Sequence, residues 1–252
     1  MAGHNKWSKV KHIKGPADAK RGKIFSKLSM EISYAARLGG GDVELNARLR
    51  QAINNAKAQN MPGDTIGRAV KKGTGDLEGA SYEEITYEAY APGGVAMLVE
   101  ILTDNRNRSA ADVRSLLSKN NGSFAETGSV AYLFNRKGEI AIAADAIEAE
   151  ALFERALEAG AEDIQSSEVG HSVTTAPDQL DAVATVLKAT GLEVEAQKLV
   201  FLPQTTIDLG DAKTARQVLQ IYHLLDDYDD TQNVFSNFEI SSELLAEIEA
   251  EI

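Results

Sequence analysis

The spacing of apolar residues changes twice along the chain and so marks three kinds of segment. In the first 72 residues apolar side chains recur every three or four positions, which is the period of one face of an α-helix. The first such stripe consists of Ile24, Leu28, Ile32 and Ala35. This pattern predicts a small all-helical module with helices at residues 16–38, 44–59 and 65–72, followed by a linker at 73–80.

After Ser81 the period becomes two, which is typical of β-strands. Alternating segments at 84–91 and 95–103 flank Pro92-Gly93-Gly94 and predict a hairpin. A helix at 109–122 follows, where Ser109 and Asp112 have the spacing of a capping box. The remaining expected elements are a strand at 129–135, a helix at 211–227 and a strand at 233–240. Because one helix and one strand cannot form a core alone, we expect the last two to join the sheet of the hairpin.

Residues 137–203 contain strand, helix, strand, strand, helix and strand in that order, which is the ferredoxin-like βαββαβ unit. The predicted fold class is therefore α+β with three domains. These are an N-terminal three-helix module at 1–80, an α/β middle domain at 81–135 and 204–252, and an inserted ferredoxin-like domain at 136–203.

The composition excludes several classes of protein. The content of 43% hydrophobic and 25% charged residues is ordinary for a soluble globular protein. No segment approaches the roughly 20 apolar residues of a membrane helix, and the basic N-terminus lacks the apolar stretch of a secretory signal. The absence of cysteine excludes disulfides and thiolate metal sites. We expect a cytoplasmic location and no membrane contact.

Charge is distributed very unevenly along the chain. Residues 1–80 contain 15 Lys and Arg against 7 Asp and Glu, a net charge of +8. Residues 81–252 contain 11 Lys and Arg against 31 Asp and Glu, a net charge of -20. Such an asymmetry indicates a basic module for polyanions attached to a body that does not bind them.

The densest basic segment is HNKWSKVKHIK at 4–14, where lysines alternate with histidines and the only tryptophan of the chain. Lysines neutralise phosphates, and an aromatic ring can stack on an unpaired base. A solvated basic tail is the simpler interpretation, but Trp7 gains little in such a tail. Trp7 could instead anchor the tail to the helical module. The candidate nucleic-acid contacts in residues 1–27 are Lys6, Trp7, Lys9, Lys11, His12, Lys14, Lys20, Arg21, Lys23 and Lys27.

A second candidate contact is DNRNRS at 104–109, where Arg106 and Arg108 precede a predicted helix. A helix N-terminus favours anions, so the two arginines could bind phosphate there. The alternative is that they pair with neighbouring acidic residues.

No arrangement of residues predicts catalysis. The chain lacks the phosphate-binding glycine loops, the zinc-protease motif and the serine-hydrolase elbow. Its four histidines have no metal-ligand spacing, and DDYDD at 226–230 lacks the glycine and glutamate of a calcium loop. We therefore expect no enzyme activity, no cofactor, no metal and no small-molecule substrate.

Seven segments of the chain resemble the YebC/PmpR family. They are MAGHNKW at 1–7, DAKRGKIF at 18–25, LGGGD at 38–42, YEAYAPGG at 87–94, LTDNRNRS at 102–109, GSVAYLF at 128–134 and ALEAGAED at 156–163. They occur in order through the whole chain, and the departures from the common family pattern, Asn5 and Gly15-Pro16, remove no basic residue. The resemblance implies a helical N-terminal domain and two α/β domains, the last inserted in the middle one, and it implies no catalytic residues.

The resemblance supports two functions. One is a DNA-binding transcriptional regulator, as family members are usually described. The alternative is a translation factor that binds the ribosome and ribosomal RNA and relieves stalling at proline-rich stretches, as is described for others, among them a mitochondrial translational activator of cytochrome oxidase. Both need basic residues and both tolerate a stacking tryptophan. The absence of a recognisable helix-turn-helix pattern weighs slightly against sequence-specific DNA recognition.

Overall fold

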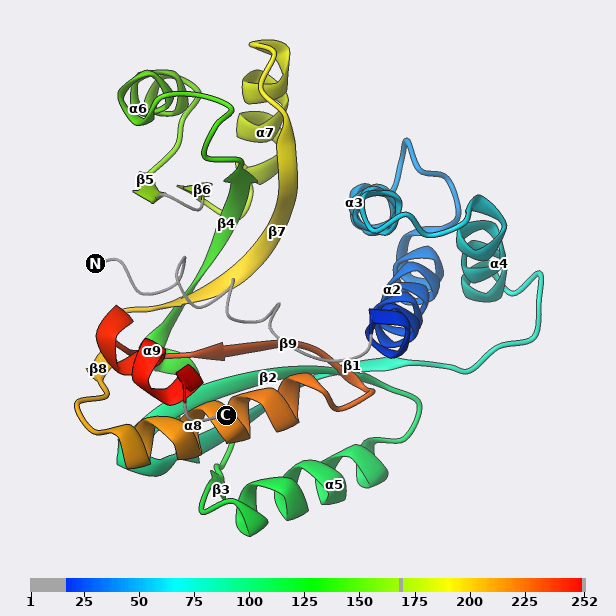
Figure 1. The fold of residues 1–252 in the computed structure, drawn as a ribbon. Helices are drawn as coiled ribbons and strands as arrows, with labels where there is room; N and C mark the ends of the chain where they lie inside the picture. Colours follow the sequence, from blue (N-terminus) through cyan, green and yellow to red (C-terminus); the bar gives the residue numbers. More distant parts are fainter. Residues whose placement is uncertain (1–16, 168–169, 251–252) are drawn as a thin grey trace. The chain divides into compact units, whose positions relative to one another are not determined.

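The structure of the protein is a computed structural model that describes residues 17–167 and 170–250 (Figure 1). Its fold is mixed α+β, as predicted. Residue contacts divide the described chain into two compact units. One unit contains Phe134–Gln204, and the other contains residues 17–133 together with 205–250. The predicted boundary at residue 80 lies inside the second unit, so the division into three domains stays a prediction.

All three predicted helices of the N-terminal module are present. They are α2 (Ala17–Gly39), α3 (Ala47–Ala58) and α4 (Gly63–Thr74). Their buried core is Ile32, Ala35, Ala36, Leu49, Ala52, Ile53, Ala56, Met61, Ile66 and Ala69. Half of these residues are alanine, so the helices can pack closely but bury little side-chain area each.

The closest packing in this module joins α2 to α4 through a glycine. A Cβ atom at Gly73 would lie 2.2 Å from the carbonyl oxygen of Ser33 and 2.7 Å from the Cβ of Ala36. The buried hydroxyl of Ser33 also donates to the carbonyl of Ala69, at 2.9 Å. No larger residue at position 73 fits this contact without moving the two helices apart.

A buried asparagine joins the end of α2 to the start of α3. The Asn46 Oδ1 atom accepts from the Leu49 amide at 3.0 Å and so caps α3. Its Nδ2 atom donates to the carbonyls of Ala35 and Gly40, both at 2.8 Å. The cap explains why α3 begins at Ala47, three residues later than predicted.

After the helical module, this unit contains a four-stranded sheet with the strand order β3-β1-β2-β9, in which all pairs are antiparallel. Its strands are β1 (Glu83–Ala91), β2 (Val95–Thr103), β3 (Ser123–Phe124) and β9 (Thr231–Ser236). Helices α5 (Arg106–Lys119) and α8 (Ala212–Asp226) pack against it. Because β9 pairs with β2, the late helix and strand do join the sheet that the hairpin begins, as expected.

Smaller elements complete this unit. They are the 3-10 turns η1 (Pro92–Gly94) and η2 (Ala131–Leu133), the parallel pair β8 (Ile207–Asp208) and β10 (Phe238–Glu239), and the helix α9 (Ser242–Ala250). The sequence interpretation missed α9.

Two local predictions here were wrong. Residues 129–135 form η2 and the start of the next strand instead of one strand, because the buried Glu88 carboxylate accepts the amides of Gly128, Val130 and Ala131. The helix predicted to begin at Ser109 begins at Arg106, because Asn105 caps it by accepting the Arg108 amide at 3.1 Å.

The other unit is the predicted ferredoxin-like fold. Its elements are β4 (Phe134–Ile142), α6 (Ala149–Glu158), β5 (Asp163–Ser167), β6 (Gly170–Thr175), α7 (Leu180–Ala189) and β7 (Val194–Pro203). The sheet is antiparallel throughout with the order β5-β6-β4-β7. Its buried core is Ile140, Ile142, Leu152, Ala156, Ala161, Val173, Leu180, Val183, Ala184, Leu187 and Leu192. Most of these are large aliphatic residues, in contrast to the core of the helical module.

Candidate nucleic-acid interface

The candidate residues from the sequence fall into three groups by what the structure describes. Lys6, Trp7, Lys9, Lys11, His12 and Lys14 lie outside the described residues, and Lys20 lies in α2 with a side chain that is not described. Arg21, Lys23 and Lys27 lie on the first turns of α2. Arg106 and Arg108 lie in the first turn of α5.

The two α2 lysines contact the C-terminal end of α8. The Lys23 ammonium donates to the Asp227 carbonyl at 3.0 Å, and the Lys27 ammonium donates to the Asp226 carbonyl at 2.5 Å. Lys23 also lies 3.9 Å from an oxygen of the exposed Asp229 carboxylate. The C-terminus of a helix has a partial negative charge, which attracts such cations. Both lysines are therefore held by an acidic turn of the same chain, whereas Arg21 is exposed to solvent.

Arg108 is held by acidic residues at the end of β2 and in the turn after α8. It donates to Asp230 at 2.8 Å and to Asp104 at 3.0 Å. The hydrogen bond and charge of Asp230 are the main reason why the pKa of Arg108 lies above its ordinary value. The structure thus places Arg108 in the local ion pairs that were the alternative to phosphate binding, while Arg106 beside it is exposed.

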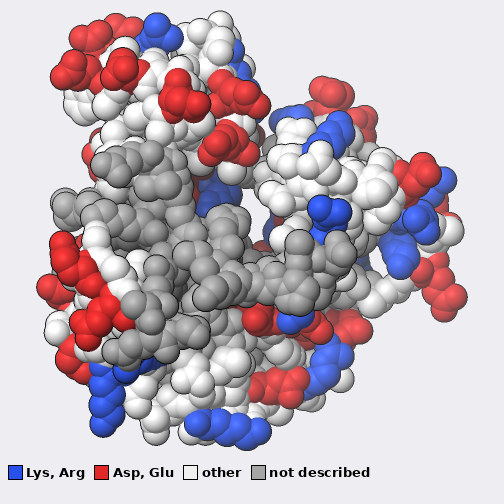
Figure 2. Space-filling view, in the orientation of Figure 1, with Lys and Arg blue, Asp and Glu red and all other residues white. Residues whose placement is uncertain are grey.

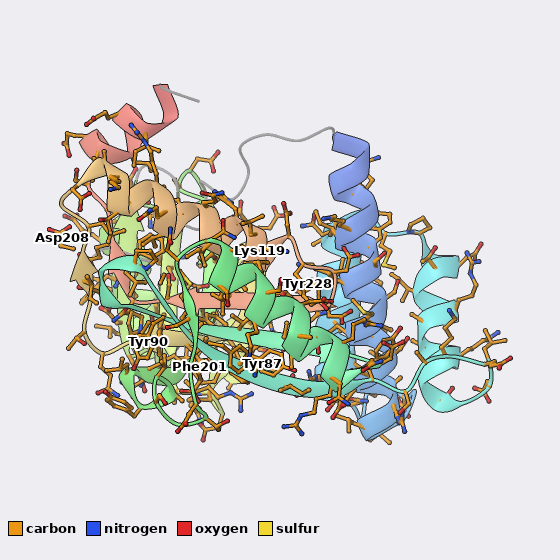
Figure 3. All side chains as sticks on the ribbon, turned by 90° about the horizontal axis from the view of Figure 1, so that it is seen from below. Tyr87, Tyr90, Lys119, Phe201, Asp208 and Tyr228 are labelled. Carbon is orange, nitrogen blue, oxygen red and sulfur yellow. The ribbon has the colours of Figure 1, made fainter. Side chains whose placement is uncertain are left out.

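The same acidic turn carries Tyr228, which Figure 3 shows beside α5. Its hydroxyl donates to the Asp112 carboxylate of α5 at 2.9 Å. Burial, this hydrogen bond and the nearby charge of Asp230 raise the pKa of Tyr228 above its ordinary value. The buried Asp230 also accepts from the Thr103 hydroxyl at 2.8 Å. The acidic turn at 226–230 is therefore a structural junction of α2, β2 and α5.

Arg48 on α3 is also engaged by acidic partners. Its guanidinium makes two hydrogen bonds to Glu31 of α2 and two to Glu84 of β1, with N–O distances between 2.7 and 3.2 Å. It also lies over the ring of Tyr34, 4.9 Å from the ring centre. Burial alone would lower the pKa of Arg48, but the contacts with Glu84 and Glu31 outweigh it and raise that pKa.

The structure reveals a set of basic residues that the sequence analysis did not select. Arg68, Lys71 and Lys72 are exposed on α4, and Figure 2 shows basic side chains over this helix. Their spacing of three and four within a predicted helix was a readable signal, because residues so spaced share one helix face. It was overlooked because the lysine density of residues 6–27 is higher.

Comparison with known proteins gives the chain a family. Residues 5–76 match the model described as the TACO1/YebC protein N-terminal domain, and residues 82–238 match the model of the TACO1/YebC second and third domain. The chain belongs to the TACO1/YebC family. The predicted resemblance is thereby confirmed.

Relatives within the family are similar over nearly their whole length. A "probable transcriptional regulatory protein" of Treponema pallidum (strain Nichols) is 53% identical, over 97% of this chain and 100% of that protein. One of Geobacter sulfurreducens with the same description is 52% identical, over 96% of this chain and 98% of that protein. The crystal structure of a conserved hypothetical protein from Aquifex aeolicus has a TM-score of 0.89 at 46% identity, and the match covers 96% and 99% of the two chains.

Two further properties concern the described part of the chain alone. Within it, no group of three or more His, Asp or Glu side chains is placed to hold a metal ion. No helix in residues 17–167 or 170–250 is long and apolar enough to cross a membrane.

Proposed function

We propose that this family member is a non-enzymatic, nucleic-acid-binding regulator of gene expression, and that its target is DNA. The observation that carries the proposal is the separation of charge, with +8 in residues 1–80 and -20 in the rest of the chain. A module with excess Lys and Arg gains affinity for phosphates by releasing counterions. The acidic remainder repels the same polyanion, so binding is directed to one end of the chain.

The names of relatives support the regulatory part of this proposal. Proteins about half identical to this chain over nearly its full length are called probable transcriptional regulatory proteins. The charge separation supports the nucleic-acid part independently of those names. The lack of a catalytic motif in the sequence is consistent with a protein that acts by binding.

The experiment is a titration of the full chain with a fluorescent DNA duplex at several salt concentrations. If about six lysines contact phosphates, the logarithm of the binding constant for the duplex should fall against the logarithm of salt with a slope of roughly -5. Binding that does not depend on salt, or no binding at low salt, would contradict the proposal.

RNA is the other candidate target, and Trp7 distinguishes the two. A ring that stacks on unpaired bases gives roughly 1–3 kcal/mol per base, which a fully paired duplex does not offer. If Trp7→Ala weakens binding to single-stranded RNA and leaves duplex DNA binding unchanged, the translational role is favoured. Equal loss on a duplex, together with a preference for base sequence, favours transcription. The circular dichroism of the variant must match that of the parent protein, because Trp7 could instead anchor the module.

A further inference from the structure

We infer that the solvent-facing side of α4, formed by Arg68, Lys71 and Lys72, is a phosphate-contact surface for nucleic acid. This inference rests on the proposed function and adds a site outside the lysine-rich N-terminus. The ligand is the sugar-phosphate backbone, because these side chains are long, flexible cations suited to phosphate contact.

The first argument is the placement of the three residues on the helix. Positions 68, 71 and 72 are separated by three and four residues, so their side chains project from one face. The opposite face of α4 contains Ala69 and Gly73, which pack against α2. The face of α4 that packs against α2 is therefore opposite the face with the three exposed cations.

The second argument is a comparison of the basic residues with one another. Lys23, Lys27, Arg48 and Arg108 each bind carbonyl or carboxylate oxygens of the same chain. Among the described residues, Arg68, Lys71 and Lys72 have no acidic side chain within ion-pair distance, and Arg68 donates only to the backbone carbonyl of Asp64. A phosphate bound at α4 would therefore not have to displace an intramolecular ion pair formed by described residues.

The third argument is the position of α4 after a short turn and the exposure of its outer face. It follows α3 after a turn of four residues, 59–62, and Figure 1 shows α3 nearly end-on while α4 is seen from the side. Positions 64, 67, 68, 71 and 72 of α4 are all exposed, so its outer face is open to solvent along most of the helix. The 12 residues of α4 span about 18 Å, enough to contact several phosphates.

A basic last turn also stabilises its own helix, since cations there interact with the helix dipole. That effect accounts for Lys71 and Lys72 but not for Arg68, which lies at the middle of the helix. Asp64 opposes the cations, because it is exposed on the same face one turn before Arg68. Removing the charge of Asp64 should therefore strengthen binding, whereas removing the cations should weaken it.

The test compares two triple variants of the full chain in binding to a fluorescent DNA duplex and to a single-stranded RNA. The first variant is Arg68→Gln, Lys71→Gln and Lys72→Gln. The matched control is Lys119→Gln, Lys188→Gln and Lys213→Gln, which removes the same charge from exposed positions outside residues 1–80. The α4 variant should bind at least roughly tenfold more weakly, with a salt slope shallower by roughly two to three units, while the control changes little.

A third variant, Asp64→Asn, should bind more tightly than the parent, an outcome that misfolding cannot produce. Parent-like binding by the α4 variant would overturn the inference and leave the proposed function intact. An equal loss in the control would also overturn it, since the effect would then be one of net charge. If the parent protein itself binds neither probe, the proposed function fails first.

Discussion

The helical module and the ferredoxin-like unit differ in the residues that form their cores and in the sign of their net charge. The core of the module is half alanine and depends on a backbone contact at Gly73, whereas that of the ferredoxin-like unit is mainly Leu, Ile and Val. The sequence gives the module a net positive charge, whereas residues 134–204 hold 5 Lys and Arg against 13 Asp and Glu. Large buried side chains stabilise a fold by area, while small ones stabilise it by close approach.

Under the proposed function, this difference assigns binding to the helical module and stability to the ferredoxin-like unit. The module brings its helices close together and exposes cations on α4, which suits a binding surface. The ferredoxin-like unit has a larger aliphatic core and a net negative charge, which under the proposed function suits a stable body that repels nucleic acid. Variants that destabilise the ferredoxin-like unit should therefore leave DNA affinity unchanged, and variants of the helical module should leave the ferredoxin-like unit stable.

The largest effect is expected in the aliphatic core. Leu152 is fully buried, so Leu152→Ala should reduce the free energy of unfolding by about 2–5 kcal/mol, through lost burial and the cavity left behind. Hydrogen exchange should accelerate in β4 and β6. At a temperature where the variant stays folded, its DNA affinity should equal that of the parent protein. A loss of affinity would show that the ferredoxin-like unit takes part in binding.

Gly73→Ala should destabilise the helical module by roughly 1–3 kcal/mol, because the new methyl group would overlap the Ser33 carbonyl. Exchange should accelerate in α2 and α4 and stay unchanged in β4 and β6. Gly75→Ala is not a suitable control, because Gly75 has a positive φ of 86°. Gly67→Ala is a suitable control, because no atom lies near a Cβ at this position and alanine favours a helix. Equal effects of both substitutions would contradict the close-packing account.

Asn46→Ala should destabilise the junction of α2 and α3 by about 1–2 kcal/mol, because it removes the cap of α3. The carbonyls of Ala35 and Gly40 lose their donor at the same time. Thermal unfolding followed by circular dichroism at 222 nm gives the size of the effect. Asn46→Asp retains the cap but not the donor, so it should lie between the parent protein and the alanine variant.

The smallest effect is expected at Tyr228. Tyr228→Phe should cost roughly 0.5–1.5 kcal/mol at neutral pH through loss of the hydrogen bond to Asp112. The folded state raises the pKa of Tyr228, so the folded protein retains a proton that the unfolded chain loses near pH 10. This contribution is fully present below pH 10 and decreases as the pH rises above it. Urea unfolding should show that the free energy of unfolding falls less between pH 8 and pH 10.5 for the phenylalanine variant than for the parent protein. Equal decreases in the two proteins would contradict this account.

Much of the fold could be predicted from local pattern. The three helices, the hairpin and the βαββαβ order all follow from periodicity, because each element has one buried face. The error at 129–135 arose because a distant side chain determines the backbone there, whereas the start of α5 is set by its neighbour Asn105. Glu88 takes the amides that a strand at 129–135 would need, and nothing near those residues indicates it.

The candidate site was harder to predict than the fold. Charge density selected Lys23 and Lys27, yet their acceptors lie 204 and 199 residues away in sequence, so no local pattern could show that they are engaged. Arg108 likewise pairs with Asp230, which is 122 residues away in sequence. Conversely, the spacing of Arg68, Lys71 and Lys72 could be read from the sequence. Only the structure shows that they have no acidic partner among the described residues.

The central claim, that nucleic acid binds residues 1–80, is tested most directly by hydrogen exchange of the full chain with and without a saturating DNA duplex. Peptides from residues 1–80, including those of α4, should be protected by the duplex. Peptides from residues 138–203 should exchange at the same rate in both samples. Protection confined to 138–203, with none in residues 1–80, would contradict the account.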